Sequence, residues 1–243
     1  MNKQISFQSK IQFVNRKEFD KIIRRNYLFS DNIDPCSMNE ALYSTRFITE
    51  KIRTCTAGGL VAPYKDSFGF HIFHDESSHK RLDAMFAEMF LFMQPERALI
   101  VGSKNVKSNE CNYSIKNFAK IKDILKNRVK HLTFFQQHRK YCSETSLYYN
   151  QKEDTWVIFC VYDQKNKNYD VVNLQNLLTA YKHIQIAEGD SLFIDGKEIL
   201  PKDCQRIFVK NWKPHQEKES LLKKIIVRVE RLKSKLCKKS PES

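Results

Sequence analysis

The stretch Ile48–Val61, ITEKIRTCTAGGLV, is rich in β-branched and apolar residues and predicts a β-strand. Gly58 and Gly59 within it let the backbone bend or be approached closely. After a turn at residues 64–67, the stretch Phe68–Asp75, FGFHIFHD, alternates aromatic residues and predicts a second strand. Together the two stretches indicate a β-hairpin.

The hairpin brings together the residue types that cysteine hydrolases use. Such enzymes need a thiolate, a nearby imidazole and a third group that orients the imidazole. Cys55 lies in the first stretch and His71 in the second, and strand pairing places opposed side chains about 5 Å apart. Thr49 precedes Cys55 by six residues, so both point to the same face of a regular strand. We expect Thr49, Cys55 and His71 to form a catalytic group, provided that no bulge at Gly58 breaks the register.

A structural role for the same residues is the alternative. A cysteine in a strand is commonly a small core residue, and a histidine on an aromatic strand is often a hydrogen-bonded structural residue. His74 and His79 raise the question of a metal site. However, His71 and His74 point to opposite faces of a strand, and no carboxylate or cysteine lies at a conventional ligand spacing. We therefore expect neither a metal nor a cofactor.

Beyond the hairpin, the sequence predicts an alternation of helices and strands. Ser78–Met93 carries apolar residues at helical spacing, and Ser78 is the expected N-cap. The other expected elements are helices at Ser114–Arg128 and Leu174–Tyr181, strands at Arg97–Ser103, His131–Phe135 and Ile207–Val209, and two hairpins, Thr145–Asn150 with Thr155–Tyr162 and Ser191–Ile199 turned by Asp195-Gly196.

Composition and length limit the class of protein. The 243 residues suffice for one large domain with or without an extension, and 41% hydrophobic residues suffice for a packed core. Seven scattered cysteines without a C-x-x-C pair argue against a disulfide framework or a zinc site and indicate a reducing compartment. No run reaches the roughly 18 apolar residues of a membrane span, and residues 1–6 lack a secretory signal. We expect a cytoplasmic location, with export by another route left open.

The charge is strongly positive, with a formal net charge of +14. Such a balance favours acidic partners, which include nucleic acid, an anionic membrane or an acidic protein surface, although a solvated surface is the commoner reading. Much of the excess lies in Lys104–Lys140 and in the last thirty residues. Residues 214–243 carry leucine, isoleucine and valine on one helical face, with lysine and arginine around them. This helix is expected to dock on the domain, pair with a partner or lie on an anionic surface.

The order of these features resembles the chemoreceptor glutamine deamidases (CheD) and the wider group that includes cytotoxic necrotizing factor and Burkholderia lethal factor. Thr49, Cys55 and His71 match the family's threonine, its catalytic cysteine six residues later and its histidine on a neighbouring strand. The helices, strands and first hairpin after His71 follow the family's order, so the resemblance covers residues 45–163. Arg53-Thr54 stands where the family usually has glycine-serine, and Gly69 stands in place of its paired glycines.

The resemblance implies an α+β fold with a layered, β-sandwich-like core flanked by helices. With the deamidase-like core at 41–165, we expect an N-terminal extension at 1–40, an additional α/β segment at 166–213 packed on the core, and the basic helix at 214–243; the segments outside the core have no counterpart in the family.

The resemblance also implies a reaction, the deamidation of a protein glutamine, and a partner that carries this glutamine. Cys55 would attack the side-chain carboxamide, His71 would move the proton and Thr49 would orient His71. The alternatives are a catalytically inactive or non-enzymatic basic binding protein, with nucleic acid as its leading ligand, and an effector that acts on a host protein.

Overall fold

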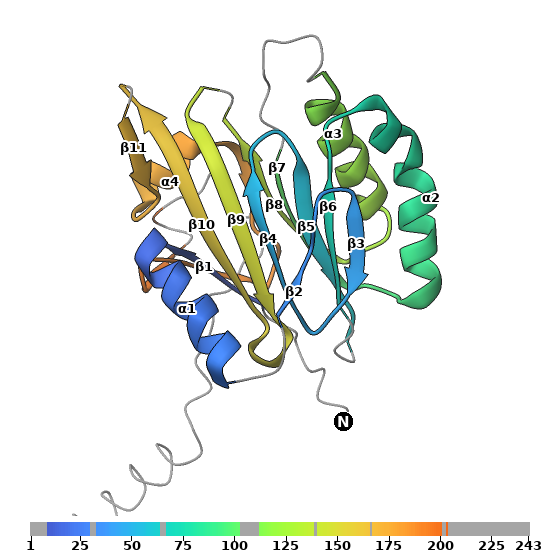
Figure 1. Cartoon of the computed structure of the whole chain (residues 1–243), viewed down its shortest axis with the longest axis horizontal. Helices are drawn as coiled ribbons and strands as arrows, with labels where there is room; N and C mark the ends of the chain where they lie inside the picture. The colour runs from blue at the N-terminus through green and yellow to red at the C-terminus, as the bar shows by residue number, and fades with distance from the viewer. Residues whose placement is uncertain are drawn as a thin grey trace, which may run out of the picture.

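Two mixed β-sheets and four helices make up the part of the chain that the computed structural model describes, which is residues 9–29, 33–63, 67–102, 112–138, 140–165, 167–200 and 203. Strands predominate, and the sheets pack face to face with helices on their outer faces (Figure 1). The predicted α+β class is therefore confirmed at this level. The likeness to a chemoreceptor-deamidase core stays a prediction.

The first sheet has the strand order β14-β13-β1-β10-β9-β4-β2, and β11 pairs with β10 outside this path. Its strands are β1 Lys10–Val14, β2 Asp34–Pro35, β4 Arg46–Ile52, β9 Cys142–Asn150, β10 Thr155–Gln164, β11 Lys167–Asp170, β13 Ser191–Ile194 and β14 Lys197–Ile199.

The second sheet has the order β12-β8-β7-β5-β6-β3. Its strands are β3 Glu40–Tyr43, β5 Thr56–Val61, β6 Ser67–Ile72, β7 Arg97–Gly102, β8 His131–Gln137 and β12 Tyr181–Gln185. The central strands β5, β6 and β7 are buried along their whole length, because the first sheet covers one face and helices cover the other.

Helices complete the layers. Helix α1 (Arg16–Phe29) packs its Phe19 against the outer face of the first sheet. Helices α2 (Glu76–Phe92) and α3 (Asn112–Lys126) cover the outer face of the second sheet, where Phe86 and Phe118 enter the core. Figure 1 shows these two helices side by side, on the far side of β5 and β6 from β9 and β10. Helix α4 (Leu174–Ala180) contributes to the core between the sheets.

Two glycines allow the two sheets to approach each other closely. Gly59 of β5 and Gly69 of β6 lie directly opposite in the ladder, and the Phe47 ring of β4 packs against both. A Cβ atom at Gly59 would lie 2.7 Å from the Phe47 ring, and one at Gly69 would lie 2.6 Å from it. The close approach depends on the absence of side chains here.

The N-terminal extension expected at 1–40 contributes a strand to the first sheet. Strand β1 lies between β10 and β13, parallel to both, and its Ile11 and Phe13 are fully buried. The prediction missed this strand because its apolar run is short and is surrounded by polar and charged residues. In the expected segment at 166–213, the described residues extend both sheets with β11, β12, β13 and β14. The predicted strand Ile207–Val209 and the basic helix at 214–243 lie outside the described residues.

Most other predicted elements lie within a few residues of their expected bounds. Helix α2 begins earlier than predicted because Asp75, and not Ser78, is its N-cap; the Asp75 carboxylate accepts a hydrogen bond from the Ser78 amide. The Asp195-Gly196 turn is confirmed, and both residues have positive φ values, 49° and 76°, as a tight hairpin turn requires.

Candidate active site

The chain crosses from one sheet to the other immediately before Cys55. Strand β4 ends at Ile52 in the first sheet, and β5 begins at Thr56 in the second. The prediction of one continuous strand over Ile48–Val61 is therefore wrong, and Thr49 does not share a strand with Cys55. We call Arg53–Cys55, the bend that joins the two strands, the crossing segment.

A β-bulge in β4 directly precedes the crossing segment. Thr49 pairs with Leu147 and Ile52 pairs with Thr145, so β4 has one more residue than β9 over this interval. Lys51 adopts a left-handed conformation with φ of 56°. The extra residue returns Ile52 to the inner face, after Phe47 and Thr49, where it is fully buried. The bulge thus lies at residues 50–51, whereas the pairing of β5 with β6 is regular across Gly58.

The predicted hairpin of β5 and β6 is confirmed, and it brings Cys55 and His71 to one pocket. Ala57 pairs with His71, and Cys55 lies two residues before Ala57, directly before the first residue of β5. Both side chains line a pocket with a volume of about 330 Å³. The other lining residues are Pro35, Cys36, Ser37, Met38, Ile48, Glu50 and Lys51.

Thr49 reaches His71 from the opposite sheet. Its Oγ1 lies 2.8 Å from His71 Nδ1, and both residues are buried. Thr49 follows Phe47 by two residues and His71 follows Gly69 by two, so this contact lies next to the close approach of the sheets. The three predicted residues therefore lie together, although a contact between sheets, and not one strand face, brings Thr49 there. Their catalytic roles stay a prediction.

Burial makes the His71 imidazole neutral at pH 7. The side chain is 5% exposed, and this burial lowers its pKa to about 4, while the nearby Cys36 backbone carbonyl acts in the opposite direction. Nε2 is buried and makes no hydrogen bond of ordinary geometry within the described residues. When Nδ1 donates its proton to Thr49 Oγ1, Nε2 carries the lone pair that a general base needs; when Nδ1 accepts from the Thr49 hydroxyl, Nε2 carries the proton.

Cys36 is a second pocket cysteine that the sequence analysis did not single out. Its thiol lies 3.7 Å from the Glu40 carbonyl oxygen, and burial, together with the Glu40 charge, raises its pKa to about 12. A thiol with such a pKa is a poor nucleophile at neutral pH. No motif marks Cys36, because it follows a two-residue edge strand that the sequence presents only as a turn.

Side-chain contacts hold the crossing segment from several directions. The Gln137 amide donates to the Ile52 carbonyl at 2.9 Å, and Thr54 Oγ1 lies 2.7 Å from His74 Nδ1. The Arg53 guanidinium pairs with Glu144 at 3.1 Å. His74 and His79 contact Thr54 and Asn117, respectively, through Nδ1 and not each other.

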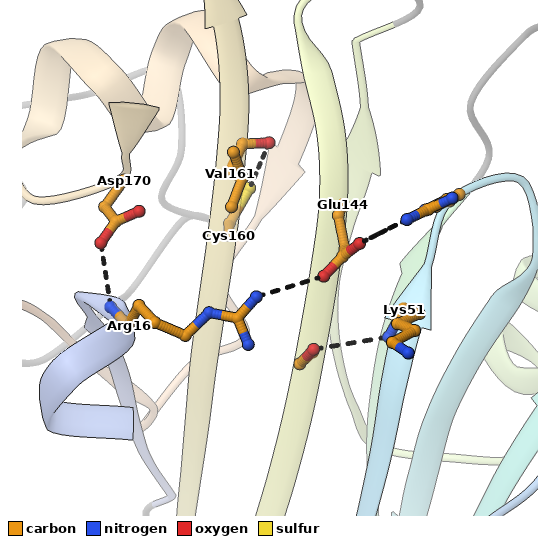
Figure 2. Close-up of polar contacts among 8 residues, drawn as sticks. Arg16, Lys51, Glu144, Cys160, Val161 and Asp170 are labelled. Carbon is orange, nitrogen blue, oxygen red and sulfur yellow. Dashed lines mark hydrogen bonds and ion pairs between the residues drawn. The ribbon is translucent and has the colours of Figure 1, made fainter. Parts of the chain in front are cut away.

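Figure 2 shows the outer side of this region. Glu144 lies between the Arg53 and Arg16 guanidiniums, and the Arg16 backbone N–H donates to Asp170 at 2.9 Å. The Arg53 side chain is 66% exposed, so its ion pair contributes at most about 1 kcal/mol. These contacts join the start of α1 to the crossing segment through β9.

Gly102, the last residue of β7, leaves room for the backbone of Cys55 and Thr56. It pairs with Thr56 and has φ of +147°. A Cβ atom here would lie 2.8 Å from the Thr56 Cα and would collide with the Cys55 carbonyl oxygen. We expect Gly102→Ala to destabilise the fold by about 1–3 kcal/mol and to slow alkylation of Cys55 by about tenfold. Urea unfolding and mass-spectrometric alkylation rates measure both effects.

Gly196→Ala is the matched control for this prediction. Gly196 also has a positive φ, but a Cβ atom there meets nothing within 4 Å. This variant is expected to lose stability through backbone strain alone and to keep the wild-type alkylation rate of Cys55. Equal alkylation rates in both variants would contradict the role assigned to Gly102.

No protein-family model matches the chain, and no curated protein matches its sequence. Among the described helices, none combines the length and apolarity needed to cross a membrane. The described residues also contain no group of three histidine, cysteine or acidic side chains that could hold a metal ion.

Proposed function

We propose that this protein is a cysteine-dependent amidase that converts a glutamine side chain of a protein substrate to glutamate. The observation that carries the proposal is that Cys55 and His71 line one pocket and that Thr49 is hydrogen bonded to the imidazole. A nucleophile, a base and a group that orients the base are the three components of a cysteine hydrolase.

In the proposed reaction, His71 Nε2 takes the Cys55 thiol proton as the sulfur attacks the carboxamide carbon. The same proton passes to the departing nitrogen, so ammonia leaves and a thioester with Cys55 remains. Water then adds to the thioester, with His71 taking its proton, and the products are a glutamate side chain and the regenerated thiol. Because burial keeps His71 neutral, the imidazole can accept a proton as the sulfur attacks.

The pocket favours a single side chain of a larger substrate. About 330 Å³ is at the low end of the range for small-molecule sites. Apolar Pro35, Met38 and Ile48 line it together with Glu50 and Lys51, and Met38 is 53% exposed. A glutamine side chain supplies methylene groups for the apolar lining, while its backbone stays outside on the substrate protein.

A thiol-reactive glutamine analogue tests this proposal. In the wild type we expect it to label Cys55 at least tenfold faster than Cys36, and we expect Cys55→Ala to abolish the labelling and His71→Ala to slow it by about 100-fold. In parallel, glutamine-containing proteins are screened for ammonia release and for a mass increase at glutamine. Labelling of Cys55 no faster than that of Cys36, or labelling that does not depend on His71, would sink the proposal. Nucleic-acid binding with steep salt dependence that survives Cys55→Ala would favour the basic binding protein instead.

A further inference from the structure

The crossing segment has no strand ladder of its own, so its side chains determine where Cys55 lies. Gln137 donates a hydrogen bond to the carbonyl of Ile52, which precedes the segment, and Glu144 forms an ion pair with Arg53, its first residue. Neither contact involves Thr54. Thr54, which precedes Cys55 directly, makes the 2.7 Å contact with His74 Nδ1.

His74 itself stands on a fixed backbone. It follows the end of β6, and its ring packs on Phe73 with centroids 4.1 Å apart. The next residue, Asp75, caps helix α2. The Phe73 amide donates at 2.9 Å to the Asn39 side chain, which also accepts from Ser78. The contact with His74 therefore connects the crossing segment to the end of β6, where several hydrogen bonds fix the backbone.

This contact repeats the geometry of the base. His71 and His74 each bond a threonine hydroxyl through Nδ1, at 2.8 and 2.7 Å. One threonine lies in β4 before the crossing, and the other lies inside it. The strand end that carries the base is thereby linked both to its orienting group and to the segment that carries the nucleophile.

We propose that Thr54 and His74 form a positioning pair whose hydrogen bond fixes the Cys55 thiol in the pocket that it shares with His71. The inference rests on the proposed function, because a fixed thiol matters only if Cys55 reacts. Neither residue lines the pocket, so both act through the backbone of Cys55. Because a displacement of about 1 Å can lower a rate by as much as 100-fold, the loss of this bond has a measurable cost.

Four variants test the pair. Thr54→Val and His74→Leu remove the hydrogen bond, whereas Thr54→Ser and His74→Asn keep a polar atom near its position. The first measurement is the rate at which iodoacetamide alkylates Cys55, and the second is kcat and KM for glutamine deamidation. We expect about tenfold slower alkylation and lower kcat at unchanged KM in the first two variants, and rates within about threefold of wild type in the other two. The double variant Thr54→Val/His74→Leu is expected to be no slower than either single variant.

Several outcomes would overturn the positioning pair. One is alkylation of Cys55 at the wild-type rate in Thr54→Val and His74→Leu. Another is a double variant in which the two losses of rate multiply. A third is a rate in Thr54→Ser and His74→Asn as low as in the apolar variants. Thermal unfolding accompanies each measurement, and if one apolar variant does not fold, the two conservative variants and the other apolar variant decide. If Cys55 is alkylated more slowly in the apolar variants but the wild type has no amidase activity, the positioning pair is supported and the proposed function is refuted. If the wild type has amidase activity but Cys55 is alkylated at the wild-type rate in the variants, the positioning pair is refuted and the proposed function stands.

Discussion

Replacing His71 by glutamine is expected to lower the rate of the proposed glutamine deamidation by about 10²–10⁴-fold, because the Cys55 thiol loses the general base proposed for it. The same variant is expected to change how stability depends on pH. The pKa of His71 is about 4 in the folded protein and about 6.5 in the unfolded chain. Between these values the unfolded chain binds more protons, so stability is complete above about pH 6.5 and falls as pH decreases toward 4. The wild type should lose about 2–3 kcal/mol from this residue by pH 4.5.

Urea unfolding at pH 7 and pH 4.5 measures the second effect. The stability difference between the two pH values should be smaller in His71→Gln than in the wild type by that amount. Other groups titrate in this range, since Asp190 has a pKa raised to about 6, but their contribution cancels in the comparison. His183→Gln is the control, because His183 is an exposed histidine on β12. Equal pH dependence in His71→Gln and His183→Gln would contradict the neutral, buried state of His71.

A methyl group at Gly59 is expected to destabilise the protein by about 3 kcal/mol. The added Cβ would lie 2.7 Å from the Phe47 ring, 2.7 Å from the Phe68 carbonyl oxygen and 2.8 Å from the Trp156 ring. One of these obstacles is backbone, which cannot move without disturbing the sheet. The sheets must separate at this point, so Thr49 should also lose its contact with His71, and Cys55 reactivity should fall with stability.

Gly69→Ala gives the matched comparison for Gly59→Ala. The three atoms nearest to a Cβ at Gly69 all belong to the Phe47 ring. Phe47→Leu should therefore relieve much of the cost of Gly69→Ala but little of the cost of Gly59→Ala. Double-mutant cycles from urea unfolding measure the two coupling energies. A Gly59→Ala protein as stable as the wild type, or equal rescue of both variants, would show that Gly59 does not set the spacing of the sheets.

The sequence predicted much of the fold because its periodic signals were strong. Each of these signals lies within one short stretch of sequence. They are the apolar spacing of α2 and α3, the alternation around His71 and the Asp195-Gly196 turn. Strand β1 escaped prediction because its partners, β10 and β13, are far away in the sequence and supply most of what stabilises it. Propensity carries little information about such a strand.

The candidate site was predicted by residue type and resemblance, but not by the correct geometry. Nothing in the stretch around Lys51 indicates a bulge, because a left-handed lysine has no sequence signature of the kind that glycine provides. The break between β4 and β5 was therefore invisible. Contacts across the sheets, such as those of Thr49 with His71 and Gln137 with Ile52, depend on tertiary packing that a single sequence does not encode locally.

The crossing of the chain between sheets also determines when the site can form. Strand β4 pairs with β9, and Ile52 accepts a hydrogen bond from a residue 85 positions away in the sequence. Strand β1 pairs with β13, near the end of the described chain. Contacts of such long sequence separation close late in folding. On a ribosome, a chain released only as far as His71 would contain the thiol, the imidazole and the threonine without the second layer that aligns them. We therefore expect a nascent chain to lack the proposed amidase activity until both sheets have formed.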